Sequence, residues 1–256
     1  MRALRYALFG DESTLPALVG MLGEAVCMCV VASNRPRAVD ALGDRAYVQP
    51  SRHDAAHAAF VAEVARAAPD LILCFSYSML IADKVLAIPP LGAINIHGGL
   101  LPRFRGANVL NWALVADVPV TGVTAHYMTS GIDEGDIVYQ LSAPISDQDT
   151  ALTLKQRLDA LGLELVSRTC AELAAGKALP RTPQDEALAR RYRRRIPEDG
   201  RIDWKTMDDR AVFNLIRALV KPWPGAFFEM PDGRRVVLDR YHTQDEVAAL
   251  RRQFVG

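Results

Sequence analysis

Three polar residues near the middle of the chain could together move protons and stabilise negative charge at a reacting carbon. Asn95 and His97 end an apolar run, and Asp133 stands between two glycines in Gly131–Asp136. An imidazole titrates near pH 6.5, so His97 can exchange protons at neutral pH. The carboxamide of Asn95 can donate to an oxyanion, and the carboxylate of Asp133 can orient the imidazole. We expect Asp133 to raise the pKa of His97, because a neighbouring negative charge favours the imidazolium.

The local sequence predicts that these side chains meet at one edge of a sheet. Asn95 and His97 lie two positions apart on a predicted strand, so they point to the same face at its carboxyl end. Open α/β sheets bind ligands at that end of their strands. Gly98 and Gly99 follow directly and allow a ligand to approach the backbone closely. Each residue alone could be an ordinary hydrogen-bonding loop residue, and it is their combination that favours a catalytic crevice.

Strand-like and helix-like segments alternate around these residues. Strands are expected at 4–9, 26–32, 46–48, 71–75, 93–96, 121–128 and 137–141, and helices at 15–23, 53–67, 108–115 and 151–175. This alternation predicts an α/β fold, a Rossmann-like and mostly parallel sheet with helices on both faces. The first strand ends in Phe-Gly-Asp-Glu and lacks the G-x-G-x-x-G fingerprint, so a dinucleotide site is poorly supported.

The composition changes after Leu179 and divides the chain into three parts. We expect a catalytic domain over 1–179, a linker over 180–201, and a small C-terminal α+β subdomain over 202–256. The last part has helical patterns at 208–220 and 244–254, and an Asp-Gly turn predicts a hairpin between them. The linker carries the basic run Arg190–Arg195, which could either contact a diphosphate or remain a solvated, extended segment.

The overall composition limits the classes of partner. Lysine plus arginine equals aspartate plus glutamate, which argues against nucleic acid as the main partner. No apolar run approaches the roughly 20 residues needed to cross a bilayer, and no signal peptide is expected, so a membrane partner is not predicted and the cytoplasm is the expected location. The four cysteines lie mainly in strand-like runs and are expected to be core thiols rather than disulfides or metal ligands.

The stretch Ala93–Tyr139 resembles the catalytic module of the formyltetrahydrofolate-dependent formyltransferases. That family has Asn-x-His, then a Ser-Leu-Leu-Pro-x-x-x-Gly loop, and an Asp 36 positions beyond the His, as between His97 and Asp133. Residues 70–95 are similar to the formyltransferase domain that modifies UDP-4-amino-4-deoxyarabinose. Residues 194–204 and 213–227 resemble the post-catalytic region of that enzyme and of methionyl-tRNA formyltransferase. The resemblance covers roughly residues 4–240.

The resemblance implies that Asn95, His97 and Asp133 are catalytic and that N10-formyltetrahydrofolate is the cosubstrate. It also implies a set of folate contacts, namely Met79, Leu80, Ile81, Thr129, Ser130, Gly131, Ile132 and Asp133. Two positions depart from the family. Gly99 replaces the usual Ser of the loop, and Ala107 replaces an Arg of the arabinose-modifying relative, so folate contacts of that Arg cannot be transferred.

The resemblance favours a nucleotide-linked amino sugar of surface-glycan or lipopolysaccharide O-antigen biosynthesis as acceptor. Candidate contacts for it are Tyr77, Arg105, Trp112, Arg193 and Trp223. The aromatic side chains among them could equally be core residues. A homodimer formed through the C-terminal part is also plausible.

Other acceptors remain open. Methionyl-tRNA formyltransferases carry a complete C-terminal barrel, whereas only about 55 residues follow Arg201 here. Glycinamide ribonucleotide formyltransferases share the three catalytic residues but normally lack the Ile-Asp-Trp and Pro-Trp-Pro-Gly region. An amino-acid or peptide formyltransferase, a formyltetrahydrofolate hydrolase and a non-catalytic folate-binding protein are further alternatives.

Overall fold

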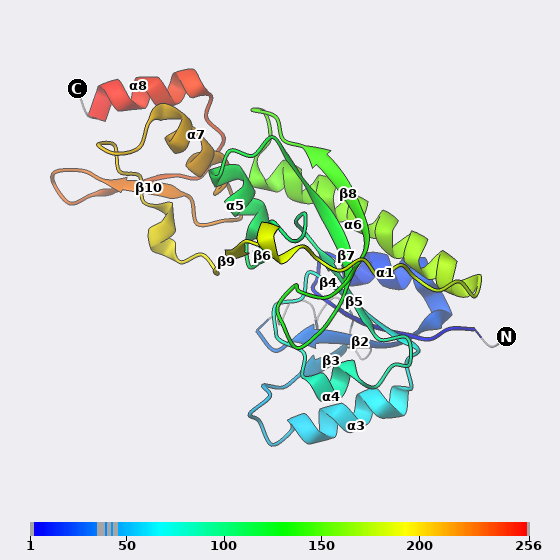
Figure 1. Ribbon diagram of the computed structural model, residues 1–256. Helices are drawn as coiled ribbons and strands as arrows, with labels where there is room; N and C mark the ends of the chain where they lie inside the picture. The colour runs from blue at the N-terminus through cyan, green and yellow to red at the C-terminus, as the bar shows by residue number, and fades with distance from the viewer. Residues whose placement is uncertain (1–2, 35–38, 40–41, 43–45, 255–256) are drawn as a thin grey trace.

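A seven-stranded sheet forms the centre of the computed structural model, which describes residues 3–34, 39, 42 and 46–254 (Figure 1). Its strands are β1 (Tyr6–Gly10), β2 (Val26–Ala32), β3 (Ala46–Gln49), β4 (Leu71–Phe75), β5 (Ala93–His97), β7 (Val120–Tyr127) and β8 (Ile137–Pro144). They lie in the order β3-β2-β1-β4-β5-β7-β8. The strands β3, β2, β1, β4 and β5 run parallel to one another. Strand β7 pairs antiparallel with β5, and β8 pairs antiparallel with β7. The predicted α/β, mostly parallel fold is confirmed.

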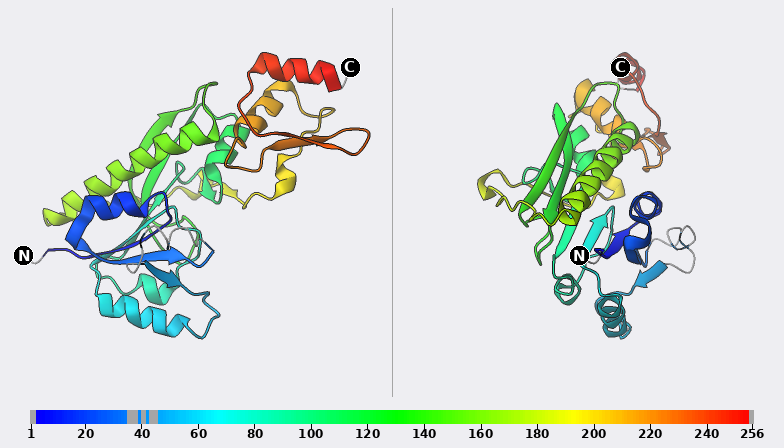
Figure 2. Two further views of the ribbon diagram at one scale, coloured as in Figure 1. Left: turned by 180° about the vertical axis from the view of Figure 1, so that it is seen from behind. Right: turned by 90° about the vertical axis from the view of Figure 1, so that its right-hand side faces the viewer.

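The central strands are apolar throughout because helices cover both of their faces. Helices α1 (Leu15–Leu22) and α6 (Ala151–Ala174) cover the face that carries Tyr6 and Leu8. Helices α3 (His57–Ala67) and α4 (Asp83–Leu86) cover the opposite face, which carries Phe9. The two layers are seen from both sides in Figures 1 and 2.

Local hydrogen bonds set where the helices begin. The side chain of Thr150 accepts from the Thr153 backbone N–H, so α6 begins at the predicted Ala151. Helix α3 begins later than the predicted residue 53. The Asp54 carboxylate accepts from the Ala56 backbone N–H at 2.8 Å, which holds the preceding residues in a turn.

The C-terminal unit consists of α7 (Asp209–Arg217), the hairpin β10 (Ala226–Glu229) and β11 (Arg235–Leu238), and α8 (Gln244–Phe254). It is joined to the sheet domain through α5 (Val109–Val115). Buried Asn111 of α5 donates to the Ala218 carbonyl at 2.6 Å, and buried Arg217 donates to the Ser146 carbonyl at 2.7 Å. The predicted helix at 208–220 is correct in place but ends at Arg217.

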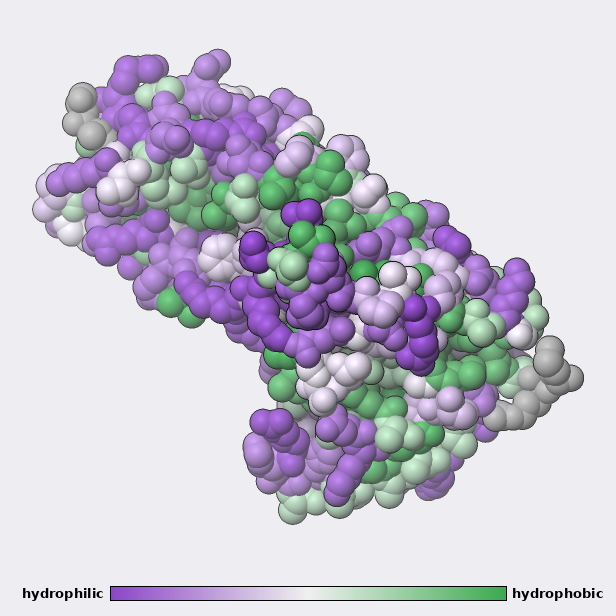
Figure 3. Space-filling view, viewed as in Figure 1, coloured by the Kyte–Doolittle hydropathy of each residue, from purple (hydrophilic) through white to green (hydrophobic). Residues whose placement is uncertain are grey.

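The segment predicted as a linker lies against the catalytic loops. Its β9 (Arg191–Tyr192) pairs in parallel with β6 (Arg105–Gly106), and Thr182 bridges to Ile137. Of the basic run Arg190–Arg195, most side chains are exposed and the backbone at Arg191–Tyr192 is extended, but backbone pairing holds this segment to the sheet domain. Figure 3 shows hydrophilic side chains gathered over this part of the surface. Within the described residues, no helix combines the length and apolarity needed to span a bilayer.

Candidate active site

Strand β5 and the loop between β7 and β8 bring Asn95, His97 and Asp133 together. Asn95 and His97 alternate along β5, which places them on one face at its carboxyl end, as predicted. Asp133 follows β7 in a loop and adopts a left-handed backbone conformation with φ of 55°. The His97 Nδ1 atom lies 3.6 Å from Asp133 Oδ2, and both side chains are about nine-tenths buried. This separation is too long for a direct hydrogen bond and short enough for a strong electrostatic interaction.

A second histidine connects Asn95 to Asp133. His126 lies opposite Asn95 on neighbouring β7, and its Nε2 is 3.2 Å from Asn95 Nδ2 and 3.4 Å from Asp133 Oδ1. Its Nδ1 donates to the Tyr127 carbonyl at 2.8 Å. The sequence pattern does not indicate this role, since a lone histidine in a half-apolar strand is typical of a core residue. Thr124 and His126 lie two positions apart on β7, as Asn95 and His97 do on β5. The spacing alone does not show that the two pairs are neighbours, and only the pairing of β5 with β7 places His126 opposite Asn95.

Burial determines the protonation of His97. Burial lowers its pKa below the ordinary value of 6.5, and the charge of Asp133 offsets this only in part. Asp133 does raise the pKa of His97, as expected, but burial has the larger effect because the ring is almost completely removed from water. The Nε2 atom lies 2.5 Å from the Phe104 carbonyl and carries the proton of the neutral ring. The Nδ1 lone pair then faces Asp133 and is the basic atom.

Asp133 is held in its ionised form. Burial raises its pKa, but His97, His126 and the backbone N–H of Gly106 together hold the pKa at about 2. Gly106 donates to Asp133 Oδ2 at 2.8 Å. Gln184 of the linker donates to the carbonyls of Asp133 and Gly135 at 2.9 and 2.8 Å. The linker therefore fixes the loop that presents the carboxylate.

Gly99 fits the site in a way that a larger residue would not. A Cβ atom at this position would lie 3.0 Å from Phe104 Cβ and 3.1 Å from His97 Nε2. A side chain at Gly99 would therefore require Phe104 or the His97 ring to shift by a few tenths of an ångström. Gly99, where the family usually has Ser, therefore leaves the His97 ring in its present position without a close contact from a side chain.

The predicted folate contacts lie in two short segments, each of which carries one exposed apolar side chain. In the first, Leu80 is 60% exposed, Ile81 is buried, and the Leu80 carbonyl accepts from Gln49 Nε2 at 2.9 Å. In the second, Ile132 is 47% exposed and directly precedes Asp133. Thr129 exchanges hydrogen bonds with Gly131 in the same loop.

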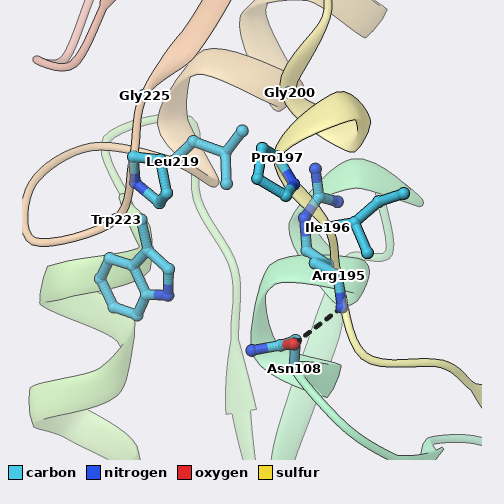
Figure 4. A pocket seen from close by; sticks show the side chains of 9 residues that line it. Asn108, Arg195, Ile196, Pro197, Gly200, Leu219, Trp223 and Gly225 are labelled. Carbon is cyan, nitrogen blue, oxygen red and sulfur yellow. Dashed lines mark hydrogen bonds between the residues drawn. The ribbon is translucent and has the colours of Figure 1, made fainter.

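The predicted acceptor contacts separate into two groups. Trp112 donates to the Arg193 carbonyl at 3.0 Å, and Arg193 pairs with both carboxylate oxygens of Asp199. Trp223 lines a cavity in the same region (Figure 4). Tyr77 lies elsewhere and packs its ring edge against Phe9.

Arg105 is a correction to the predicted acceptor contacts. Its side chain is 1% exposed, and its guanidinium donates to Gln184 and Glu186. The donors are used within the protein, so Arg105 anchors the linker and is not placed to contact a substrate.

Comparisons with known proteins identify the family and the fold of the chain. The family model described as formyl transferase matches residues 29–170, and the model described as formyl transferase, C-terminal domain, matches residues 195–250. The chain is similar in structure to a 4-N formyltransferase from Francisella tularensis, with a TM-score of 0.78 and 17% identity over 94% of this chain and 98% of that one. It is also similar to a sugar N-formyltransferase from a Shewanella species, with a TM-score of 0.75 and 20% identity over 94% and 98%. HypX from Aquifex aeolicus in complex with tetrahydrofolic acid matches with a TM-score of 0.67 and 20% identity, over 93% of this chain and 38% of that one.

Proposed function

We propose a reaction for this chain, which belongs to the formyl transferase family. It moves a formyl group from N10-formyltetrahydrofolate to the amine of a nucleotide-linked amino sugar. The observation that carries the proposal is the convergence of His97, Asp133 and Asn95. The imidazole and the carboxylate lie 3.6 Å apart although they are distant in sequence, and the carboxamide joins them through His126.

His97 is suited to take the proton of the attacking amine. Its pKa is lowered by burial, so the ring is neutral at working pH and Nδ1 is free to accept. Protonation at Nδ1 produces an imidazolium beside the ionised Asp133, which stabilises it. The new bond joins the amine nitrogen to the formyl carbon, and the proton can then pass from His97 to the leaving nitrogen of the donor as the old bond breaks.

Asn95 is suited to stabilise the oxyanion. Its carboxamide has two N–H groups, and one of them points to His126 at 3.2 Å. The second is available for negative charge on the formyl oxygen. Loss of one such donor costs about 3–4 kcal/mol of barrier in acyl transfer.

The exposed segments around the three residues suit a folate donor. The apolar side chains of Leu80 and Ile132 are 60% and 47% exposed, which fits contact with a flat ring system. Backbone groups of Met79–Ile81 and Thr129–Asp133 would supply polar contacts.

The acceptor assignment is supported by two kinds of observation. The chain and the sugar N-formyltransferase from Shewanella match over 94% and 98% of their lengths, so the two have similar extents. The formal net charge of zero gives no support for a tRNA acceptor.

The proposal is tested with a panel of acceptors. Purified protein is given N10-formyltetrahydrofolate and UDP-, dTDP- or GDP-linked amino sugars, with methionyl-tRNA, glycinamide ribonucleotide and free amino acids as alternatives. We expect mass spectrometry to find one nucleotide sugar heavier by a formyl group. Consumption of methionyl-tRNA alone would overturn the acceptor, and loss of the formyl group only to water would indicate a hydrolase.

A further inference from the structure

The segment that the proposed function gives to the formyl donor, residues 76–81, has no regular structure of its own. It connects β4 to α4, and its first residue, Ser76, adopts a left-handed backbone conformation with φ of 56°. Within the described part of the chain, no backbone–backbone hydrogen bond involves residues 76–81. Their N–H groups are therefore available to a ligand, but side chains from elsewhere must set the conformation of the segment.

Gln49, the last residue of β3, holds this segment from the side of the sheet. It is 1% exposed. Its Nε2 atom donates to the Leu80 carbonyl at 2.9 Å, and its Oε1 atom accepts from the Tyr77 hydroxyl at 2.9 Å. A backbone carbonyl can only accept, so the bond to Leu80 fixes which end of the carboxamide carries the N–H groups. One buried side chain thus contacts the segment near both of its ends.

The Tyr77 side of this contact is itself fixed. The Tyr77 ring packs edge-on against buried Phe9, and the ring centres lie 5.4 Å apart. Burial raises the pKa of the Tyr77 hydroxyl above its ordinary value, so the group keeps its proton and donates to Gln49. Gln49 and Tyr77 together therefore connect the core of the sheet domain to a segment that backbone pairing does not hold.

Further contacts of the segment lie at the surface. The Ser78 hydroxyl, for example, donates to Asn34 Oδ1 at 2.9 Å in an exposed position. A hydrogen bond at the surface is exchanged for one with water at little cost, whereas loss of a partner inside the protein leaves a desolvated polar group. The buried bond from Gln49 to the Leu80 carbonyl therefore holds the backbone of Met79–Ile81 more firmly than the surface contacts do.

We propose that Gln49 is a positioning residue for the formyl donor, because it holds the folate-binding segment in the conformation that binds. The proposal rests on the proposed function, which gives Met79–Ile81 to the folate. Three strands lie between β3 and β5 in the sheet, so Gln49 acts on the donor through the segment and not on the reacting atoms. A segment that is ordered before binding loses less conformational entropy when the ligand arrives, so Gln49 increases the affinity for folate without changing the chemical step.

Calorimetric titration of the intact protein with tetrahydrofolate, under exclusion of oxygen, tests this proposal. Gln49→Met removes both hydrogen bonds with a side chain of similar length and should weaken binding by about tenfold or more. Tyr77→Phe removes one of the two bonds and should weaken binding by a smaller factor. The double variant should bind as Gln49→Met does, because both changes act through one carboxamide. Tetrahydrofolate binding as tight as that of the parent in a folded Gln49→Met protein would overturn the proposal.

Two control variants separate positioning from general stability. Gln156→Met makes the same substitution at an exposed position of α6 and should bind tetrahydrofolate as the parent does. Val247→Ala removes volume from a buried position of α8, so it should lower the stability while leaving the affinity for folate unchanged. Equal weakening in Val247→Ala and Gln49→Met would overturn the proposal. If Gln49→Met does not fold, Tyr77→Phe takes its place, and parent affinity in that variant would then overturn the proposal.

Two further measurements locate the effect in the segment. Hydrogen exchange of the backbone amides of residues 76–82 should be faster in Gln49→Met than in the parent, and unchanged in Gln156→Met. Steady-state kinetics with the identified acceptor should show the KM of the donor raised by about tenfold or more, with kcat and the KM of the acceptor unchanged. A lower kcat with an unchanged KM of the donor would contradict a positioning role.

The failure of this proposal is distinguishable from failure of the proposed function. If the parent binds tetrahydrofolate and a folded Gln49→Met protein binds it equally well, the function stands and the role of Gln49 falls. If the parent does not bind tetrahydrofolate, both fall.

Discussion

At the scale of single residues, the site depends on a histidine that is basic and buried at once. Burial lowers the pKa of His97 below its ordinary 6.5, while Asp133 remains ionised with a pKa of about 2. The neutral ring is the resting form at working pH, and the ionised carboxylate stabilises the imidazolium only after a proton has been taken up.

The pKa of His97 can be measured directly. We expect its ring signals in an NMR titration to move with a midpoint below pH 6.5, because desolvation disfavours the charged form. In Asp133→Asn the midpoint should fall further, since the neighbouring negative charge is removed. Signals absent from His97→Gln provide the assignment. A midpoint above 6.5 in the parent would mean that the charge of Asp133 outweighs burial.

Gly98 and Gly99 form a matched pair for testing the packing around His97. A Cβ at Gly99 would press on His97 and Phe104, whereas a Cβ at Gly98 meets nothing within 4 Å. Gly99→Ala should lower the free energy of unfolding by about 1–3 kcal/mol, as overpacking does. Gly98→Ala should change it by less than about 1 kcal/mol in either direction. Equal effects in urea denaturation would show that the His97 ring is not confined as described.

At the scale of secondary-structure elements, the catalytic geometry depends on the pairing of β5 with β7 and on the linker. The pairing sets His126 opposite Asn95, and Gln184 and Arg105 tie the linker to the loop of Asp133. Neither contact follows from local sequence. Strand neighbours in a sheet depend on the packing of the whole chain, and residues 180–201 lack the apolar periodicity that would have indicated their position.

The buried Arg105 makes Glu186 a sensitive position. Glu186→Ala would leave a cation that is 1% exposed without its carboxylate. We expect the free energy of unfolding to fall by more than in the control below, although Gln184 still accepts from Arg105 and limits the loss. Glu164→Ala, at an exposed position of α6, is the control and should change stability by less than about 0.5 kcal/mol. The same small effect for both variants in chemical denaturation would contradict the role given to this ion pair.

At the scale of the whole molecule, the sequence was most informative where the patterns were long. The apolar runs at 26–32 and 71–75 and the periodic segment at 151–175 correspond to β2, β4 and α6 because burial on a sheet requires those patterns. The positions of Asn95 and His97 followed from the alternation along a strand. The role of Arg105 and the contact of Asn95 with His126 did not, because both arise from residues brought together only in the fold.

The C-terminal unit is bound to the sheet domain by buried polar groups. Asn111 donates to the Ala218 carbonyl, and Arg217 donates to the Ser146 carbonyl. Separation would leave these buried groups to find new partners, and it would expose apolar surface of α5 and α7. We therefore propose that residues 1–179 and 202–256 unfold together, and expect one cooperative transition in differential scanning calorimetry. Two resolved transitions would mean that the parts are independently stable.

The most direct measurement of the central claim is the single-turnover rate of formyl transfer in Asn95→Ala, His97→Ala and Asp133→Ala, once the acceptor panel has identified the amine. Circular dichroism and folate binding confirm that each variant is folded and still binds its donor. We predict that each rate falls by about a hundredfold or more, because each variant loses a proton carrier, its stabilising charge or an oxyanion donor. A folded His97→Ala protein that transfers the formyl group at the rate of the parent would contradict the account.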